Sequence, residues 1–312
     1  MAACASLRRD GRRGPRSSFV ASASISHAAL VRRAATGPDI DPGDTTCAVV
    51  LRRHRDGDWI DTSDEVAREE PLEIQLGPVS LAVIMRTPGH DEDLALGFLV
   101  TERVVGSPAD VLAIRHCTTS ASPEAEDNIV RVTLAPHVVV DMEALRRNLY
   151  ANSSCGICGK ATIANVMATA APLDDPAVFD ATLLADLPAR LAAGQDAFDR
   201  TGGLHAAGLF DASGTLMVVR EDVGRHNAVD KVVGWATRAN RLPLSGHILM
   251  ISGRISFEIV QKALAARIPL IAAVSAPSSL AVEMAHAAGL TLVGFLRGET
   301  MNVYANTARV RG

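Results

Sequence analysis

The sequence lacks any uninterrupted apolar stretch of about 18 residues, the length that a membrane-spanning helix requires. Cysteines are also few, with five among 312 residues, an odd number scattered along the chain. Such a distribution does not form the disulfide framework of a small secreted protein, so a reducing compartment is favoured. These absences argue against a membrane span and a disulfide scaffold, whereas an apolar content of 48% provides for a sizeable buried core.

Most of the chain has no excess of basic residues. Residues 1–33 contain seven arginines and one aspartate, a net charge of +6, and since the whole chain carries −4, the remainder carries −10. A folded region with a net negative charge is a poor nucleic-acid binder. Residues 1–43, rich in Arg, Ala and Ser, are typical of a disordered tail or an overlong start assignment, with a transit sequence as the alternative.

Beyond this tail the pattern predicts an α/β protein of two domains. Residues 44–140 contain short strand-like runs and one helix opened by Thr87-Pro88-Gly89-His90-Asp91, which indicates a small α+β domain. Residues 141–308 alternate buried strands with amphipathic helices, which predicts parallel strands and right-handed crossovers. The predicted strands of this alternation are Ile248–Ile251, Leu270–Val274 and Leu290–Leu296, and the predicted helices are Arg225–Arg238, Phe257–Ala266 and Leu280–Ala288.

Polar loops follow these strands, at the ends where open parallel sheets bind ligands. Hydroxyls and backbone N–H groups at a helix start suit a phosphate, and an arginine such as Arg297 clamps one bidentately. A single such loop is most often an ordinary helix cap, but several at corresponding ends of one sheet predict a large phosphate-bearing ligand. The loops are Thr201–His205, Glu221–Asn227, Ser252–Ser256, Ser275–Ser279 and Arg297–Thr300.

The most unusual stretch is Asn152-Ser153-Ser154-Cys155-Gly156-Ile157-Cys158-Gly159-Lys160, a Cys-x-x-Cys motif. Residues 160–171 repeat apolar side chains at helical spacing, which predicts an amphipathic helix that begins at the motif. The free N–H groups and positive dipole end of a helix stabilise a thiolate and lower the pKa of a thiol. Gly156 and Gly159 let another molecule approach the sulfurs closely. The motif therefore predicts a reactive thiol pair.

Other roles for this thiol pair stay open on the residues alone. A zinc site needs two more ligands, and the nearest candidates, His116 and Cys117, lie about 40 residues upstream without a second Cys-x-x-Cys. A thioredoxin-like pair follows the first strand of a βαβ unit, which here lies far downstream, and a buried inert pair is disfavoured by the flanking glycines. A zinc-dependent cytidine deaminase is rejected, because Ala207 replaces the glutamate of an H-x-E motif starting at His205.

Four long motifs occur in a fixed order: Ser153–Lys160, Thr201–Ala207, Glu221–Lys231 and Ser252–Glu258. Shorter ones extend into the first domain: Pro71-Leu72, Met85-Arg86-Thr87-Pro88 and Leu96-Gly97-Phe98-Leu99. Together they closely resemble the FdhD family of formate dehydrogenase accessory sulfurtransferases, from about Thr45 to Ala305. Two departures limit the resemblance. Residues 1–43 have no counterpart, and Glu102-Arg103 stands where many relatives have Glu-Gly.

The resemblance implies a cytoplasmic sulfur carrier that takes persulfide sulfur from a cysteine desulfurase. It passes the sulfur to the molybdenum (or tungsten) bis(molybdopterin guanine dinucleotide) cofactor, a bound substrate, which then enters the formate dehydrogenase apoenzyme. The implied fold is a cytidine-deaminase-like αβα domain with a mixed sheet, residues 141–308, after a smaller N-terminal α+β domain, residues 44–140. The implied assembly is a homodimer, and no permanently bound metal, nucleic acid or membrane partner is expected.

The resemblance makes Cys155 the principal persulfide carrier, while Cys158 either receives the sulfur or resolves Cys155 as a disulfide. It implies that a segment near the C-terminus contacts the cofactor: Phe295, Leu296, Arg297, Gly298, Glu299 and Thr300. Further candidate ligand contacts are Ser252, Gly253, Arg254, Ser278, His205, Asp222 and His226, of which His205, Asp222 and His226 could instead satisfy loop hydrogen bonds. The alternative function is a cofactor-binding chaperone that transfers no sulfur.

Overall fold

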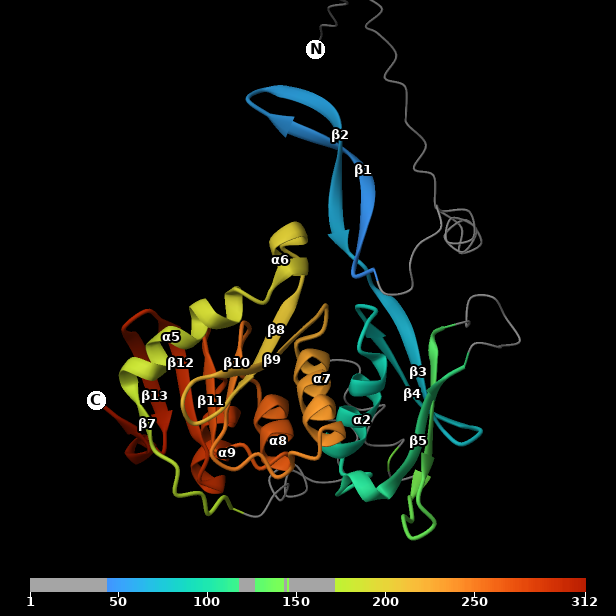
Figure 1. Cartoon of the computed structure of the whole chain (residues 1–312). Coiled ribbons are helices and arrows are strands. Elements are labelled where there is room, and N and C mark those ends of the chain that lie inside the picture. Colours follow the sequence, from blue (N-terminus) through green and yellow to red (C-terminus); the bar gives the residue numbers. More distant parts are fainter. Residues whose placement is uncertain (1–43, 118–126, 143–144, 146–171) are drawn as a thin grey trace, which may run out of the picture. The chain divides into compact units, whose positions relative to one another are not determined.

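A six-stranded mixed sheet built from the second half of the chain positions most of the predicted site residues (Figure 1). The computed structural model describes residues 44–117, 127–142, 145 and 172–312. Across the sheet the strands follow the order β13-β12-β11-β10-β8-β9. They are β8 (His205–Phe210), β9 (Leu216–Asp222), β10 (Ile248–Ile251), β11 (Leu270–Ala273), β12 (Thr291–Arg297) and β13 (Thr300–Ala305).

The predicted β-α-β alternation is confirmed at the centre of this sheet. Strands β10, β11 and β12 are parallel neighbours, and every residue of β10 and β11 is buried. A parallel strand covered on both faces needs apolar side chains throughout, which explains the continuous apolar runs. Strands β8 and β13 run antiparallel to their neighbours at either side, so the sheet is mixed.

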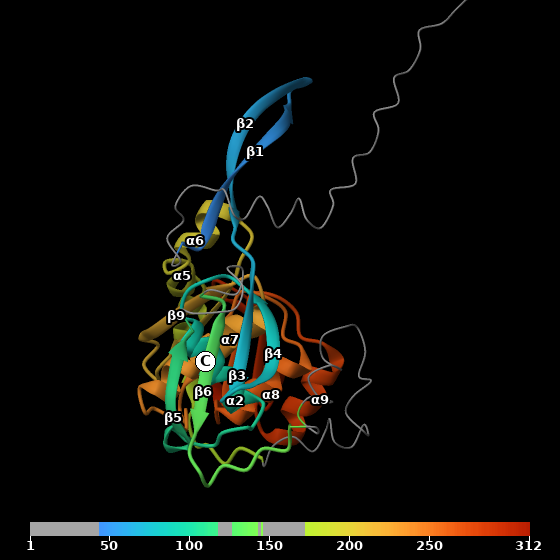
Figure 2. The ribbon, with the colours of Figure 1, turned by 90° about the vertical axis from the view of Figure 1, so that its right-hand side faces the viewer.

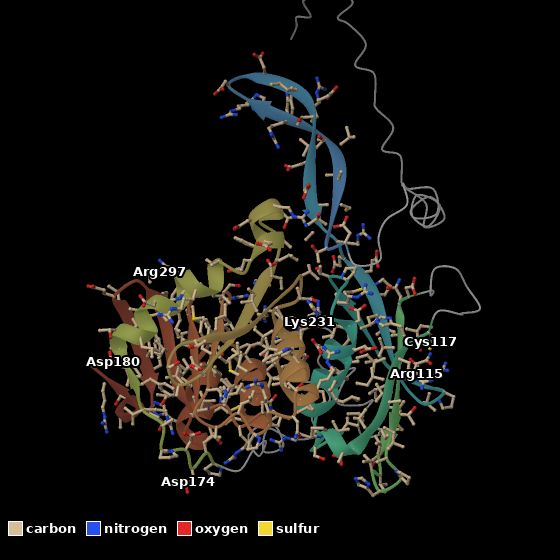
Figure 3. The ribbon with its side chains drawn as sticks, in the orientation of Figure 1. Arg115, Cys117, Asp174, Asp180, Lys231 and Arg297 are labelled. Carbon is tan, nitrogen blue, oxygen red and sulfur yellow. The ribbon has the colours of Figure 1, made fainter. Side chains whose placement is uncertain are left out.

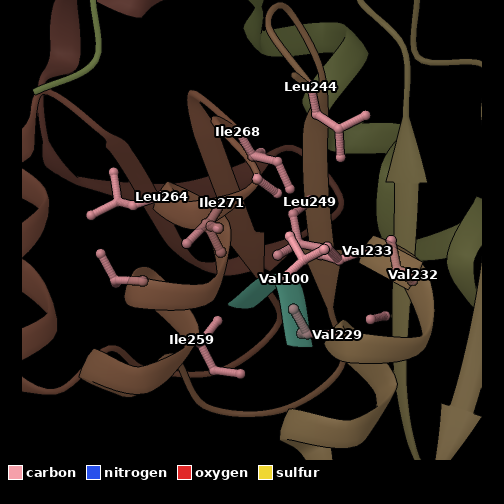
Figure 4. Packing of buried hydrophobic residues seen from close by; sticks show 14 of the residues in the cluster. Val100, Val229, Val232, Val233, Leu244, Leu249, Ile259, Leu264, Ile268 and Ile271 are labelled. Atoms are coloured by element: carbon pink, nitrogen blue, oxygen red, sulfur yellow. The ribbon is translucent and has the colours of Figure 1, made fainter. Parts of the chain in front are cut away.

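Alternate residues of β10 serve two hydrophobic clusters on opposite faces of the sheet. Leu249 and Ile251 belong to the cluster that includes Val229 and Ile259, on α7 (Arg225–Arg238) and α8 (Phe257–Ala265), as Figure 4 shows for part of it. Met250 belongs to the second cluster, with the buried leucines of α5 (Ala181–Ala192). Helix α9 (Ser279–Ala288) joins the first cluster. This αβα layering explains why the apolar runs are unbroken.

A second sheet comes from the first half of the described chain and has the order β4-β3-β6-β5 (Figure 2). Its antiparallel β3–β4 hairpin and strand β6 account for strand-like runs that the sequence predicted in residues 44–140. Helix α2 (Asp91–Thr101) follows this hairpin and packs against both the sheet and α7. The strands are β3 (Glu70–Leu76), β4 (Val79–Arg86), β5 (Val111–His116) and β6 (Ile129–Leu134).

Two glycines allow α2 and α7 to approach each other closely. A Cβ added to Gly97 of α2 would lie 1.7 Å from the carbonyl oxygen of Asp230, and one added to Gly234 of α7 would lie 1.8 Å from that of Asp93. No side chain fits at such distances, so the two backbones touch where the helices cross. The crossing fixes α7, whose first turn carries candidate site residues.

The remaining elements lie at the margins of the two sheets. A separate two-stranded ribbon is formed by β1 (Thr46–Arg55) and β2 (Asp58–Ala67). The others are the short helix α6 (Asp196–Thr201), the parallel pair β7 (Phe179–Asp180) and β14 (Val310–Arg311), and the 3₁₀ turns η1 (Pro108–Asp110) and η3 (Thr307–Arg309). Residues 42–312 form one compact unit, and the predicted boundary near residue 140 stays a prediction. Among the described helices, none is both long and apolar enough to cross a bilayer.

Candidate functional site

Strand directions bring most of the predicted loops to one edge of the six-stranded sheet. His205 at the start of β8 pairs with Asp222 at the end of β9, and Ala207 pairs with Ile251 at the end of β10. Because β10, β11 and β12 are parallel, their carboxyl ends lie at this same edge. Figure 3 shows Arg297 at this edge, near the end of β12. The loops that sequence analysis singled out therefore share one edge, which we call the carboxyl edge.

The loop after β10 is fastened directly to the start of β8. The backbone N–H of Ser252 donates to the carbonyl of Ala206 over 3.0 Å, and the Ser252 hydroxyl oxygen accepts from the N–H of Ala206 over 2.9 Å. Gly253 lies against the imidazole of His205, since a Cβ on Gly253 would stand 3.3 Å from Nδ1. Ser252, Gly253 and His205 thus form one packed group.

His226, in the first turn of α7, lies against the first turn of α8. Its Nε2 is 3.2 Å from the hydroxyl of Ser256 and 3.9 Å from Oε2 of Glu258. Ser256 occupies the N-cap position of α8, but its side chain makes no capping bond there. The hydroxyl that the sequence pattern assigns to a cap instead positions His226.

Positive charge surrounds the two histidines. Burial, Lys262 and Arg225 lower the pKa of His226 to about 4, against a smaller opposing effect of Glu258. Burial and Arg225 likewise lower the pKa of His205. Both rings are therefore neutral near pH 7. Since an unfolded histidine titrates near pH 6.5, the unfolded chain binds more protons than the folded one between about pH 6.5 and 4, and stability falls as the pH drops through that window.

Lys262 is held in place by a buried network between three helices. Its Nζ lies 2.9 Å from both carboxylate oxygens of Asp230 in α7 and 3.0 Å from the hydroxyl of Thr101 in α2. Although burial opposes its charge, Asp230 and the nearby Glu102 raise the pKa of Lys262. The ammonium therefore stays charged and adds to the positive field at His226.

Arg225 and Arg254 have no carboxylate partner within the described part of the chain. Arg225 begins α7 and its buried Nε has no hydrogen-bond acceptor there. Arg254 is exposed in the loop after β10, and its charge contributes to the lowered pKa of His205. Guanidinium groups left without acids beside two neutral imidazoles favour an anionic ligand.

The sequence left two roles open for Asp222, a ligand contact or loop hydrogen bonds, and in the structure it makes loop hydrogen bonds. Its side chain is fully buried, and Oδ2 lies 2.7 Å from Nζ of Lys231, also buried. Oδ1 accepts from the N–H of Gly224 and from Nδ2 of Asn227, each over 2.8 Å. Lys231, labelled in Figure 3, also donates to the carbonyl of Thr87 over 2.8 Å. The pair joins the 87–91 turn to the site loop and leaves Asp222 with little capacity for a ligand.

Replacing Asp222 by alanine is expected to destabilise the protein by about 3 to 5 kcal/mol, because the buried ammonium of Lys231 loses its counter-charge. The double variant Asp222→Ala with Lys231→Met should recover part of that loss, since no buried charge is left unpaired. Urea unfolding of both variants measures the difference. Equal stability of Asp222→Ala and the unmodified protein would show that the pair carries no such energy.

Ser278 caps a helix, which was the alternative to its predicted ligand contact. Its hydroxyl oxygen accepts from the N–H of Ala281 over 3.3 Å at the start of α9. Its own N–H donates to the carbonyl of Ile255 over 2.9 Å, which ties the loop after β11 to the loop after β10. The two loops are thus rigidly coupled along the carboxyl edge.

The segment Phe295–Thr300 forms the end of β12 and the turn into β13. Phe295 has a positive φ of 51° at a register irregularity, is 39% exposed, and donates from its N–H to the carbonyl of Ser275 over 3.1 Å. Arg297 pairs with Thr300, so Gly298 and Glu299 form the turn. The side chains of Phe295, Arg297, Glu299 and Thr300 are exposed and available to a ligand.

Leu296 differs from its neighbours in this segment. Its side chain is fully buried in the cluster that α5 covers, which leaves backbone atoms for the predicted ligand contact of this residue. The backbone irregularity at Phe295 turns alternate side chains so that Leu296 packs inward. The segment also lies three strands from His205, about 14 Å at the usual strand spacing. The carboxyl edge is therefore an extended candidate site.

Cys155 and Cys158 lie outside the described residues, so their predicted roles stay predictions. The described part of the chain contains two other cysteines, Cys47 and Cys117, both half-buried and free. Neither was predicted to carry sulfur.

A family model described as the FdhD/NarQ family matches residues 67–311. The chain belongs to the FdhD/NarQ family. The matched range contains both sheets and the whole carboxyl edge, whereas nearly all of the β1–β2 ribbon precedes it. The resemblance stated from the motifs is confirmed.

Curated members of the FdhD/NarQ family named sulfur carrier protein FdhD match over most of their length. The Nocardia farcinica protein is 54% identical over 251 residues, which cover 80% of this chain and 88% of the relative. The Streptomyces coelicolor protein is 54% identical over 262 residues (83% and 93%), and the Mycobacterium tuberculosis protein is 49% identical over 265 residues (83% and 96%).

A solved structure confirms the mixed α/β fold of this FdhD/NarQ member. It is the crystal structure of a protein from Desulfotalea psychrophila provisionally described as a formate dehydrogenase accessory protein. The TM-score is 0.68 at 24% identity, and the match covers 86% of this chain and all of that chain.

Sequence reasoning missed several residues that shape this FdhD/NarQ site. Arg225 was quoted within a motif but not named as a ligand contact, although its neighbours in the loop were. Glu221 accepts from the N–H groups of Ala197 and Phe198 over 3.0 and 2.7 Å, and so fastens α6, although burial raises its pKa. The available signal for Arg225 in the sequence was its place directly before His226 in a motif already singled out.

Proposed function

We propose that this protein is a sulfur carrier that accepts persulfide sulfur from a cysteine desulfurase. It delivers the sulfur to a molybdenum or tungsten bis(molybdopterin guanine dinucleotide) cofactor, its bound substrate, for the formate dehydrogenase apoenzyme. Relatives named sulfur carrier protein FdhD, about half identical over most of the chain, support the carrier role. We place the protein in the cytoplasm.

The observation that carries the ligand part of this proposal is the positive carboxyl edge. Arg225, Arg254 and Arg297 lie there without a carboxylate partner in the described part of the chain. Dinucleotide phosphates are anions that guanidinium groups bind bidentately. The span from His205 to Arg297 suits a ligand with several phosphates, such as one with two guanine dinucleotide arms.

The carrier step transfers one sulfur atom between thiols. The Cys155 thiolate attacks the terminal sulfur of the desulfurase persulfide, that S–S bond breaks, and the desulfurase cysteine leaves as a thiolate. Cys155 then carries the sulfur as an anionic persulfide, so the exchange needs no outside oxidant or reductant. Cys158 either receives the sulfur or resolves Cys155 as a disulfide. The alternative, a cofactor-binding chaperone, would use the carboxyl edge without either cysteine.

Binding of guanosine diphosphate, followed by calorimetry, tests the ligand part. The affinity should fall at least about tenfold in Arg225→Gln and in Arg254→Gln, the loss of roughly one charge-assisted contact. Arg115→Gln is the matched control, because Arg115 is exposed on β5 outside the proposed site and should bind normally. Unchanged binding in both site variants would refute the ligand role of the carboxyl edge.

Removing Arg225 is also expected to raise the pKa of both His205 and His226, since its charge lowers both. An anion bound between the two rings should also raise both pKa values, because negative charge favours the protonated imidazole. Binding is therefore accompanied by proton uptake as the pH falls toward the raised pKa values. Nitrogen NMR of the imidazole rings follows each titration, with Arg115→Gln as the control. The account is contradicted if the pKa of His226 in Arg225→Gln equals that in the unmodified protein and also does not change when pyrophosphate is added.

We further infer that the six-stranded sheet and its helices have the cytidine-deaminase-like arrangement. The mixed sheet order β13-β12-β11-β10-β8-β9, with helices on both faces, supports this αβα assignment. The His205-Ala206-Ala207 stretch lacks the glutamate that deaminase chemistry requires. The fold would then hold a nucleotide-bearing ligand without zinc chemistry.

A further inference from the structure

The segment Met85–Thr87 belongs to the first half of the described chain, yet several of its hydrogen bonds lead to the second half. Met85 and Arg86 end strand β4 of the four-stranded sheet, and Thr87 follows directly. Helices α2 and α7 lie side by side between the two sheets, which brings the end of β4 near the start of α7 (Figure 1). The motif that contains this segment has no part in the proposed sulfur transfer or in the proposed ligand contacts. Its contacts with the second half therefore indicate a separate, supporting role.

Thr87 is fully buried, and most of its hydrogen bonds lead to the loop between β9 and α7, residues 222–224, which we call the β9–α7 loop, or to α7 itself. Its N–H donates to Oδ2 of Asp222 over 3.2 Å, and its hydroxyl oxygen accepts from the N–H of Val223 over 3.2 Å. Its carbonyl accepts from Nζ of Lys231 over 2.8 Å. The hydroxyl in turn donates to the carbonyl of Arg68 over 2.9 Å. Because the site is buried, water cannot replace a bond that is lost there.

Asn227 makes a second connection between the same two parts of the chain. Its Nδ2 donates to the carbonyl of Met85 and to Oδ1 of Asp222, each over 2.8 Å. The same Oδ1 accepts from the N–H of Gly224 over 2.8 Å. A Cβ on Gly224 would stand 2.8 Å from Nδ2 of Asn227, so the glycine leaves room for this amide. The β9–α7 loop is thus held from two sides.

Arg86 makes the segment a firm support for these contacts. Its guanidinium is bidentate to Asp91, with Nε 3.0 Å from Oδ1 and Nη2 2.8 Å from Oδ2. It also donates to Oε2 of Glu70 over 3.3 Å and to Oδ1 of Asn128 over 2.9 Å. The side chain is only 2% exposed. A buried, bidentate ion pair fixes the geometry of both partners, so the segment itself has little freedom to shift.

Arg225 depends on the β9–α7 loop for the direction of its side chain. It follows Gly224 and begins α7, and its buried Nε has no hydrogen-bond acceptor in the described part of the chain. Because no acid there holds the guanidinium, the backbone that carries Arg225 decides where it points. A shift of the loop would move Arg225 and its neighbour His226 together. The contacts that hold the loop therefore set the geometry of the carboxyl edge.

We propose that Thr87 and Asn227 are positioning residues for the carboxyl edge: they fix the β9–α7 loop against the four-stranded sheet and so direct Arg225 toward an anionic ligand. The inference rests on the proposed function, because it concerns the same ligand site. Neither residue contacts the ligand, and each acts through the backbone of the loop. The four-stranded sheet thereby takes part in ligand binding without supplying a ligand contact of its own.

Calorimetric titration with guanosine diphosphate tests this proposal on Thr87→Val and Thr87→Ser. Valine keeps the shape of the side chain but leaves the N–H of Val223 without an acceptor, so the Kd should rise at least about fivefold. Serine keeps the hydroxyl and should bind within about twofold of the unmodified protein. Thr237→Val is the matched control, because Thr237 is equally buried in α7 but donates to the carbonyl of Val233 over 2.7 Å. Its stability should fall while its Kd stays unchanged.

Two further variants separate positioning from a general loss of stability. Thr87→Val combined with Arg225→Gln should bind within about twofold of Arg225→Gln alone, since the hydroxyl acts through the arginine. Asn227→Ala removes the second connection and should also weaken binding. It takes the place of Thr87→Val if that variant does not fold. Urea unfolding establishes which variants are folded at the temperature of the titration.

Normal affinity in folded Thr87→Val, or in folded Asn227→Ala where it takes that place, overturns the proposal. An equal loss in Thr237→Val, or a further full loss when Thr87→Val is added to Arg225→Gln, overturns it as well. Absence of binding by the unmodified protein contradicts the ligand part of the proposed function, and this proposal with it. Equal binding by the unmodified protein and Thr87→Val overturns the positioning role alone.

Discussion

Replacing Gly234 by alanine is expected to destabilise the protein by about 3 kcal/mol or more, because the new Cβ overlaps backbone atoms of α2. A Cβ at this position would stand 1.8 Å from the carbonyl oxygen of Asp93, and neither helix backbone can yield as a flexible side chain would. Helix propensity alone predicts the opposite sign, since alanine in a helix interior is favoured over glycine by about 1 kcal/mol. Urea unfolding of the variant measures which effect dominates.

Gly97→Ala should behave like Gly234→Ala, because a Cβ there would stand 1.7 Å from the carbonyl oxygen of Asp230. Gly106→Ala is the control, with its nearest contact at an ordinary 3.7 Å, and should change stability by no more than about 0.5 kcal/mol. If Gly234→Ala unfolds at the same or a higher urea concentration than the unmodified protein, the close helix crossing is wrong. The site would be affected too, since α7 begins with Arg225 and His226.

Replacing Cys155 by alanine is expected to abolish the support of formate dehydrogenase activity in a bacterial strain that lacks its own FdhD-family protein. A thiolate is the nucleophile in persulfide transfer, and alanine offers none. The measured quantity is formate oxidation by cell extracts, at matched levels of soluble variant protein. The expected effect is loss to the background of the deletion strain.

Cys47→Ala and Cys117→Ala are the controls for this prediction. Both cysteines are half-buried in the described part of the chain, and neither belongs to the Cys-x-x-Cys motif. Their variants should support near-normal activity. Full activity of a soluble Cys155→Ala protein would favour the chaperone alternative, which needs cofactor binding at the carboxyl edge but no thiol.

The central sheet was predictable from the sequence because its strands are buried on both faces. Ile248–Ile251 and Leu270–Ala273 contain only apolar residues, and a fully covered parallel strand permits little else. Helix α7 was predicted with its observed bounds, since its apolar residues recur at helical spacing. Strand β2 was missed, because Asp58–Ala67 is solvent-exposed and mostly polar, so burial imposes no pattern on it.

The location of the candidate site was predictable from the sequence, but the roles of its individual residues were not. The strand ends indicated the loops, and the sheet topology brings them to one edge. Local sequence does not show that Asp222 pairs with Lys231 or that Leu296 turns inward, because both depend on tertiary contacts. For the same reason Arg225 was not singled out. Its significance comes from the missing acid, which is a property of the folded neighbourhood.

Intact-protein mass spectrometry tests the sulfur-carrier account most directly. The reduced protein is incubated with a cysteine desulfurase and cysteine, then measured with and without a further reductant, beside Cys155→Ala and Cys47→Ala. The account predicts a reducible gain of one sulfur atom in the unmodified protein and in Cys47→Ala, and no gain in Cys155→Ala. No gain on folded, reduced, unmodified protein, or an equal gain on Cys155→Ala, would contradict it.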